Sequence, residues 1–191
     1  MPLIMGILAQ AAAAPGPTPG AAAYDLLETQ VLASSASSVT FTGLDTLAAG
    51  YKHLQIRAVT RTTRASSNDV VLLNFNSDTG SNYAWHSLRG TGSAVTSGAG
   101  TSQTYIQLGI TQTTDNTADA FGPLVADILD FSSSSKNTTV RSLSGQTTGN
   151  TFIDLRSGLF NSTSAVTSME LTQFGTNFVA GSRFSLYGRA A

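Results

Sequence analysis

Apolar residues recur at every second position from Tyr24 onward, in short runs separated by Gly, Asn, Asp and Ser. This period predicts β-strands that turn one face toward a core. In residues 52–61, for example, Leu54, Ile56 and Ala58 fall on one side and polar residues on the other. About ten such runs predict an all-β fold, an antiparallel, jelly-roll-like β-sandwich, with another sandwich topology as the alternative.

Three stretches allow more specific predictions. Residues 71–75 alternate, and the polar residues 76–82 then lead to 83–85, which predicts a hairpin. Residues 121–131 are apolar on both faces, as in a central strand that is packed on two sides. Residues 93–100 are Gly, Ser, Ala, Thr and Val, and we expect a mobile loop there.

The first 23 residues have a different pattern: a short apolar head, then alanines, then a Pro/Gly-rich tether. We therefore predict an extended arm over residues 1–23 and a single β-sandwich domain over 24–191. A signal peptide is the alternative, but the head carries no Lys or Arg and its apolar run is short. The prolines also end the run well before the roughly 20 residues that a membrane span needs, so no membrane partner is expected.

Energetics suggest what the arm does. Ordering a backbone costs roughly 1–2 kcal/mol per residue, whereas burying an apolar side chain returns about 1.5–3 kcal/mol. Five side chains cannot order some 20 residues alone, so we expect the arm to dock on another subunit. The candidate assembly residues are Leu3, Ile4, Met5, Ile7 and Leu8.

The composition of the chain limits the classes of molecule that it can bind. Charged residues make up 11% of the 191 residues and the formal net charge is −1, so the chain lacks the basic footprint of a nucleic-acid-binding protein. Ser and Thr supply about a quarter of the chain, which predicts a hydroxyl-rich surface. Cysteine is absent, which excludes disulfides and Cys-ligated metals.

Candidate catalytic motifs are weak. Asp78-Thr79-Gly80-Ser81 resembles the carboxylate loop of aspartic proteases, but that chemistry needs two carboxylates and a homodimer would have to supply the second. A turn is the better interpretation. His53 and His86 have no neighbouring ligand at metal-binding spacing. Serines are plentiful enough for a Ser-His-Asp triad, but no Gly-x-Ser-x-Gly elbow occurs.

Two groups are candidates for surface contacts. Arg57, Arg61 and Arg64 form a basic stripe that suits a phosphate, a solvated face or a neighbouring subunit's carboxylates. Trp85 and several tyrosines could form a sugar-binding platform, although core or interface packing is the commoner use. We carry Arg57, Arg61 and Trp85 forward as surface or subunit contacts, and predict no enzyme activity and no cofactor.

Four segments, together with the start of the chain, carry a likeness to known proteins. The segments are residues 53–57, 75–83, 127–131 and 178–188, and the start of the chain has Ile7-Leu8 after Gly6. Together they resemble a family of small virion structural proteins from tailed bacteriophages. The resemblance covers nearly the whole chain. It implies a jelly-roll-like subunit that is built into the particle and is usually oligomeric, and it brings no catalytic residues.

The leading hypothesis is a capsid decoration or cement protein, a homotrimer on the phage head whose arm reaches a neighbouring subunit or the major capsid protein. The alternative is a tail, baseplate or fibre component involved in host attachment. A glycan hydrolase is a third class, but Asp127 and Asp130 differ in parity and would point to opposite sheet faces.

Overall fold

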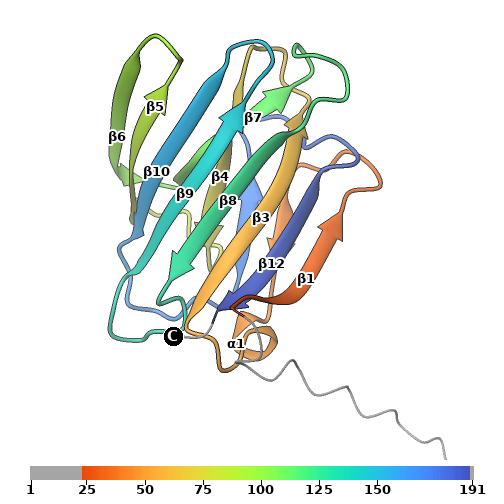
Figure 1. Ribbon diagram of the computed structural model, residues 1–191. Helices are drawn as coiled ribbons and strands as arrows, with labels where there is room; N and C mark the ends of the chain where they lie inside the picture. Colours follow the sequence, from red (N-terminus) through yellow and green to blue (C-terminus); the bar gives the residue numbers. More distant parts are fainter. Residues whose placement is uncertain (1–22, 190–191) are drawn as a thin grey trace, which may run out of the picture.

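A computed structural model describes residues 23–189, and nearly all of the regular secondary structure in that range is made of β-strands (Figure 1). A single short helix, α1 (Leu44–Leu47), interrupts them there. The strands are β1 (Asp25–Val31), β2 (Val39–Phe41), β3 (His53–Thr62), β4 (Asp69–Phe75), β5 (Tyr83–Gly90), β6 (Val95–Gln103), β7 (Ile106–Thr113), β8 (Gly122–Leu129), β9 (Thr138–Gln146), β10 (Phe152–Phe160), β11 (Met169–Thr172) and β12 (Arg183–Arg189).

The strands form two layers. The larger layer has the order β1-β12-β3-β8-β9-β10-β5-β6, and the smaller one has the order β2-β11-β4-β7. Figure 1 shows the larger layer in front, with β4 and β7 behind it. A short parallel pairing of Arg61 and Thr62 with Gln112 and Thr113 joins the layers, and the other ladders within residues 23–189 are antiparallel. The predicted all-β sandwich is confirmed.

Strand pairing is nested. β1 pairs with β12, β2 with β11, β3 with β8 and β4 with β7, so early strands meet late ones. The same pairing results when one long antiparallel hairpin is rolled up so that its successive strand pairs are distributed over the two layers. The hairpins β5–β6 and β9–β10 extend the larger layer beyond it. The nesting favours the jelly-roll assignment, which stays a prediction.

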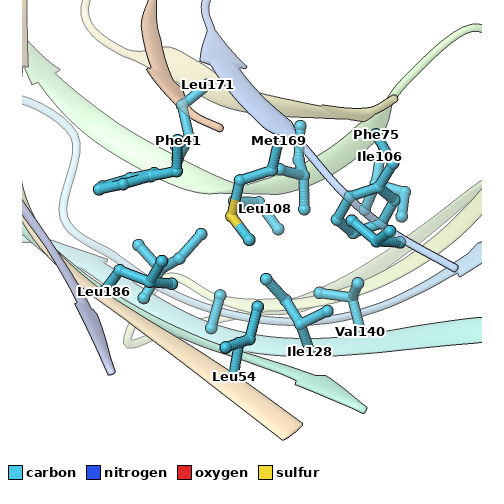
Figure 2. Packing of buried hydrophobic residues seen from close by; sticks show 14 of the residues in the cluster. Phe41, Leu54, Phe75, Ile106, Leu108, Ile128, Val140, Met169, Leu171 and Leu186 are labelled. Carbon is cyan, nitrogen blue, oxygen red and sulfur yellow. The ribbon is translucent and has the colours of Figure 1, made fainter. Parts of the chain in front are cut away.

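The core lies between the layers (Figure 2). Phe41, Met169 and Leu171 from the smaller layer face Leu54, Ile128, Val140 and Leu186 from the larger one. Each of these side chains is at most 3% exposed. Alternation places them there, because every second residue of a strand points inward.

Three local predictions are wrong. β4 and β5 do not form a hairpin: residues 76–82 carry the chain from the smaller layer to the larger one. Residues 93–100 are not a mobile loop, because most of them form β6 against β5. Finally, β8 is buried on one face only, and Val125 on its other face is 40% exposed.

Candidate assembly surface on the larger layer

Exposed apolar side chains gather on the outer face of the larger layer. Among residues 23–189, eight large apolar side chains stand out as exposed. The strand register places them all on this face, opposite the core. They are Leu26, Val31, Leu88, Val95, Val125, Leu143, Ile153 and Leu155.

Four of them form a row across adjacent strands. Val125 pairs with Leu143, Leu143 with Leu155, and Leu155 with Leu88. Directly opposite residues in antiparallel strands have Cβ atoms about 5 Å apart, so the row is a continuous apolar stripe. The next row adds Ile153 and Val95, which both pair with Gly90. We call these six the apolar patch: Leu88, Val95, Val125, Leu143, Ile153 and Leu155.

The patch is hollowed. Ile153 lies between Gly145 on β9 and Gly90 on β5, and neither glycine has a side chain to fill the space beside it. An open hollow of about 280 Å³ is lined by Pro123, Leu124, Val125, Leu143, Ser144, Gly145 and Ile153. A neighbouring one of about 410 Å³ is lined by Val125, Asp127, Arg141, Ser142, Leu143 and Leu155. The face therefore offers grooves between its apolar side chains.

A polar edge borders the patch on β3 and β12. The guanidinium of Arg57 lies 5.0 Å from the ring centroid of Tyr24 and 4.4 Å from that of Tyr187. Its Nε donates to Oε1 of Gln55 at 2.7 Å. Arg57 also pairs directly with Val125 across the strands, so this cation–π cluster lies at the end of the apolar row.

Asp127 continues the polar edge toward β9. Its carboxylate accepts a hydrogen bond from Gln55 Nε2 at 2.7 Å and another from Arg141 Nε at 2.8 Å. Partial burial raises the pKa of Asp127, but the hydrogen bonds from Gln55 and Arg141 and the charge of Arg141 outweigh it, so the pKa lies below its ordinary value. The carboxylate is therefore ionised at neutral pH.

An ion pair lies under β10, on the inner side of the patch. Arg156 donates through Nε and Nη2 to Oδ2 of Asp154 at 2.8 and 2.6 Å, and through Nη1 to Gln107 of β7. Asp154 is 0% exposed and Arg156 is 3% exposed. Burial lowers the pKa of Arg156, and the hydrogen bond to Asp154 opposes this. The pair fixes β10 against the edge of the smaller layer.

The three residues predicted as surface or subunit contacts have different positions. Arg57 is exposed, at the border of the patch. Arg61 is only 7% exposed, and its guanidinium donates to the carbonyl oxygens of Thr117 at 2.7 Å and Ala120 at 3.1 Å. The surface role predicted for Arg61 is wrong: it holds the loop after β7, where β3 passes between the two layers.

Trp85 is half-buried against the core, which excludes the exposed sugar platform that the sequence suggested for it. The backbone of β6 covers its ring, because a Cβ on Gly100 would lie 2.8 Å from Trp85 Cε2. Tyr83 is 1% exposed, and Tyr105 packs edge-on against Phe174. The five candidate side chains of the arm, Leu3 to Leu8, lie outside the described residues.

The remaining candidate groups have local roles. The carboxylate of Asp78 accepts from the backbone N–H of Gly80 at 2.7 Å and from Asn82 Nδ2 at 2.9 Å, as in a turn. His53 Nδ1 accepts from the backbone N–H of Asp130 at 3.0 Å. Within residues 23–189 no group of three or more His, Cys, Asp or Glu could hold a metal ion. In that same range no helix has both the length and the apolar character to cross a membrane.

Sequence reasoning missed the patch as a site, although its signal was present. Val140 and Leu143 in β9 differ in parity, so one of them must face away from the core. Leu155 and Phe160 in β10 differ in the same way. The two-sided apolar pattern of residues 121–131 was attributed to a strand covered on both faces, whereas its outer face is uncovered.

Known proteins add no assignment to this surface. No family model matches the chain, and no curated protein or solved structure matches it. The candidate surface therefore rests on the geometry of the larger layer alone.

Proposed function

We propose that this protein is a non-enzymatic structural subunit of a virion, and specifically a decoration protein on the head of a tailed phage. In this proposal it associates as a homotrimer and contacts the major capsid protein. The observation that carries the proposal is the concentration of exposed apolar side chains on one sheet face. The resemblance of four segments to small phage virion proteins supplies the context.

The patch has the composition of an association surface. Soluble monomers rarely expose contiguous apolar area beyond a few hundred Å², and larger patches with a polar rim mark interaction sites. Here the apolar row of Val125, Leu143, Leu155 and Leu88 is bordered by Arg57 and Asp127. An apolar centre with a polar rim is the anatomy of protein interfaces. Association with a partner would cover the outer face of β8, which no other part of the described chain covers.

Particle occupancy tests the proposal. Phage encoding Leu143→Asp with Leu155→Asp should carry at least about tenfold less of the protein per particle than wild type, because two carboxylates in the interface would be desolvated without partners. Thr139→Asp is the matched control, since Thr139 lies on the same face of β9, is also exposed, and is outside the patch. Equal occupancy of the double variant and wild type would refute the role of the patch.

Copy number separates the two placements in a particle. Quantitative mass spectrometry of purified particles should find hundreds of copies if the subunit decorates the head. A few to a few tens would instead indicate a tail, baseplate or fibre component. Absence of the protein from purified particles would contradict both placements.

Trimerisation has its own measurement. Light scattering of the purified full chain should give three times the mass of one chain. A stable monomer at high concentration would contradict the homotrimer.

A further inference from the structure

We propose that the apolar head of one copy, Leu3 to Leu8, docks in the apolar patch of a second copy. The inference rests on the assembly role proposed above and names the occupant of that surface. It commits to exchange of the segment between two copies of this chain. Docking on the same copy, or face-to-face packing of two patches, are the competing arrangements.

The first described residues lie on the same face of the larger layer as the apolar patch. Tyr24, the residue before β1, places its ring over the guanidinium of Arg57 at 5.0 Å. Arg57 is on the outer face of the larger layer, directly opposite Val125, the first member of the apolar row. The first 22 residues therefore join the sandwich beside the polar edge of the patch, and not at the smaller layer.

The length of the preceding segment suits a second copy. Residues 9–22 contain three prolines, and about 14 residues at roughly 3.1 Å each in a Pro-rich extended form reach about 43 Å. The segment enters the larger layer at β1, and the far end of the row, Leu88 on β5, lies six strand spacings from β1, or about 29 Å. An extended tether would carry the head past the patch of its own copy, and docking there would require it to fold back.

The size of the patch favours a segment over a sheet-to-sheet dimer. Its six side chains are between 40% and 71% exposed, which amounts to roughly 600 Å² of apolar surface. A stable dimer with standard interfaces needs about 800 Å² from each partner. The hollows beside Ile153 and Leu143 would also stay unfilled between two flat faces, whereas single side chains fit into them.

The apolar head and the apolar patch are chemically complementary. The side chains of residues 1–24 carry no charge, and those of the patch are all apolar. Asp127 and Arg141 at the rim neutralise each other in an ion pair at 2.8 Å, so they leave no unpaired charge beside the groove. Arg57 does not line either hollow, so a segment without charged side chains can fill both hollows without desolvating an isolated charge.

The absence of cysteine from the chain permits a direct test with single-cysteine variants of the full-length protein. One variant carries Met5→Cys in the head, and another carries Ser157→Cys, which is exposed on the patch face of β10 two residues from Leu155. Mixing them under mild oxidation should give a disulfide-linked heterodimer. The control is Thr40→Cys, exposed on β2 in the smaller layer, which should link to Met5→Cys at least about tenfold less.

Each other result counts against the inference. A disulfide that forms only within one chain of a Met5→Cys/Ser157→Cys double variant would show docking on the same copy. Ser157→Cys chains that link to each other more than to Met5→Cys would show face-to-face packing. Equal linking of Met5→Cys to Thr40→Cys and Ser157→Cys would show random collision.

Mass measurements provide a second test on cysteine-free protein. Full-length variants Ile4→Asp/Ile7→Asp and Leu143→Asp/Leu155→Asp should both shift the light-scattering mass from the oligomer to the monomer, and Thr139→Asp should not. Unchanged mass in the first two would overturn the inference. Because these experiments use purified protein alone, they can fail while particle occupancy still supports the proposed function, and the reverse also holds.

Discussion

Asp127 shows how one residue secures the rim of the outer face. Gln55 and Arg141 both donate to its carboxylate, from the strands on either side of β8. Its pKa is depressed in the folded protein, so it contributes stability above the ordinary carboxyl range, and that contribution is lost as pH falls through the folded pKa.

Asp127→Asn should therefore destabilise the protein by about 1 kcal/mol near neutral pH, since charged hydrogen bonds from two donors are weakened. The difference from wild type should begin to shrink as the pH drops below about 4, the ordinary pKa of an Asp carboxyl, and should vanish once the pH is below the lower pKa of folded Asp127. Urea unfolding at a series of pH values measures this. Asp115→Asn, in the exposed loop after β7, is the control and should change little. A difference that is constant with pH would contradict the assignment.

The Asp154–Arg156 pair gives a second prediction at this scale. Arg156→Met removes the main partner of a carboxylate that is 0% exposed and leaves it close to Arg89 alone, at 3.5 Å. We expect a loss of roughly 3–5 kcal/mol in the free energy of unfolding. Adding Asp154→Leu should recover much of it, because the buried charge is then gone. A double variant less stable than Arg156→Met would contradict this account.

At the level of elements, the two layers approach each other closely where β10 crosses β7. A Cβ on Gly158 would lie 2.4 Å from Cγ2 of Ile106, so this position requires the absence of a side chain. Glycine at residue 158 thereby sets how near the larger layer lies to the edge of the smaller one.

Gly158→Ala should cost about 1–3 kcal/mol, because β10 or Ile106 must move within a packed interior. Gly90→Ala is the matched control in the neighbouring strand β5, since a Cβ there has no neighbour within 4 Å. It should be neutral or slightly stabilising. Thermal unfolding of both variants distinguishes them, and equal midpoints would show that the close approach does not matter.

The strands could be predicted from the sequence where apolar and polar residues alternate clearly. Leu54, Ile56 and Ala58 identify β3 from the sequence, and all three are buried. β6 was missed because it is interrupted by Gly and Ala residues, which have low strand propensity, and pairing with β5 overrides that propensity. Arg61 was predicted to lie on the surface because the alternation of polar and apolar residues does not show that the end of β3 passes between the two layers.

At the scale of the molecule, long-range pairing dominates. Thr29 of β1 pairs with Ser185 of β12, and Phe41 of β2 pairs with Met169 of β11. Local sequence cannot specify such partners, which is why 76–82 looked like a hairpin turn. The patch was hidden for the same reason: Val125, Leu143, Leu155 and Leu88 become one surface only after four strands have paired.

Refolding should consequently be slow, in the range of milliseconds to seconds or longer, because distant segments must meet before many contacts form. Stopped-flow fluorescence can follow it through Trp85, the only tryptophan in the chain, whose ring becomes covered by β6. Complete recovery of the native signal within a millisecond would contradict a folding barrier set by this topology.

The position of β12 also matters during synthesis. β12 lies between β1 and β3. β1 therefore cannot pair with β12 until the ribosome has added more than 150 further residues. At roughly 5–20 residues per second, the delay is on the order of 10–30 s. A polypeptide released early lacks β12, and β1 then has no strand to join it to the larger layer. A chain without β12 therefore cannot complete the larger layer, whose outer face carries the apolar patch.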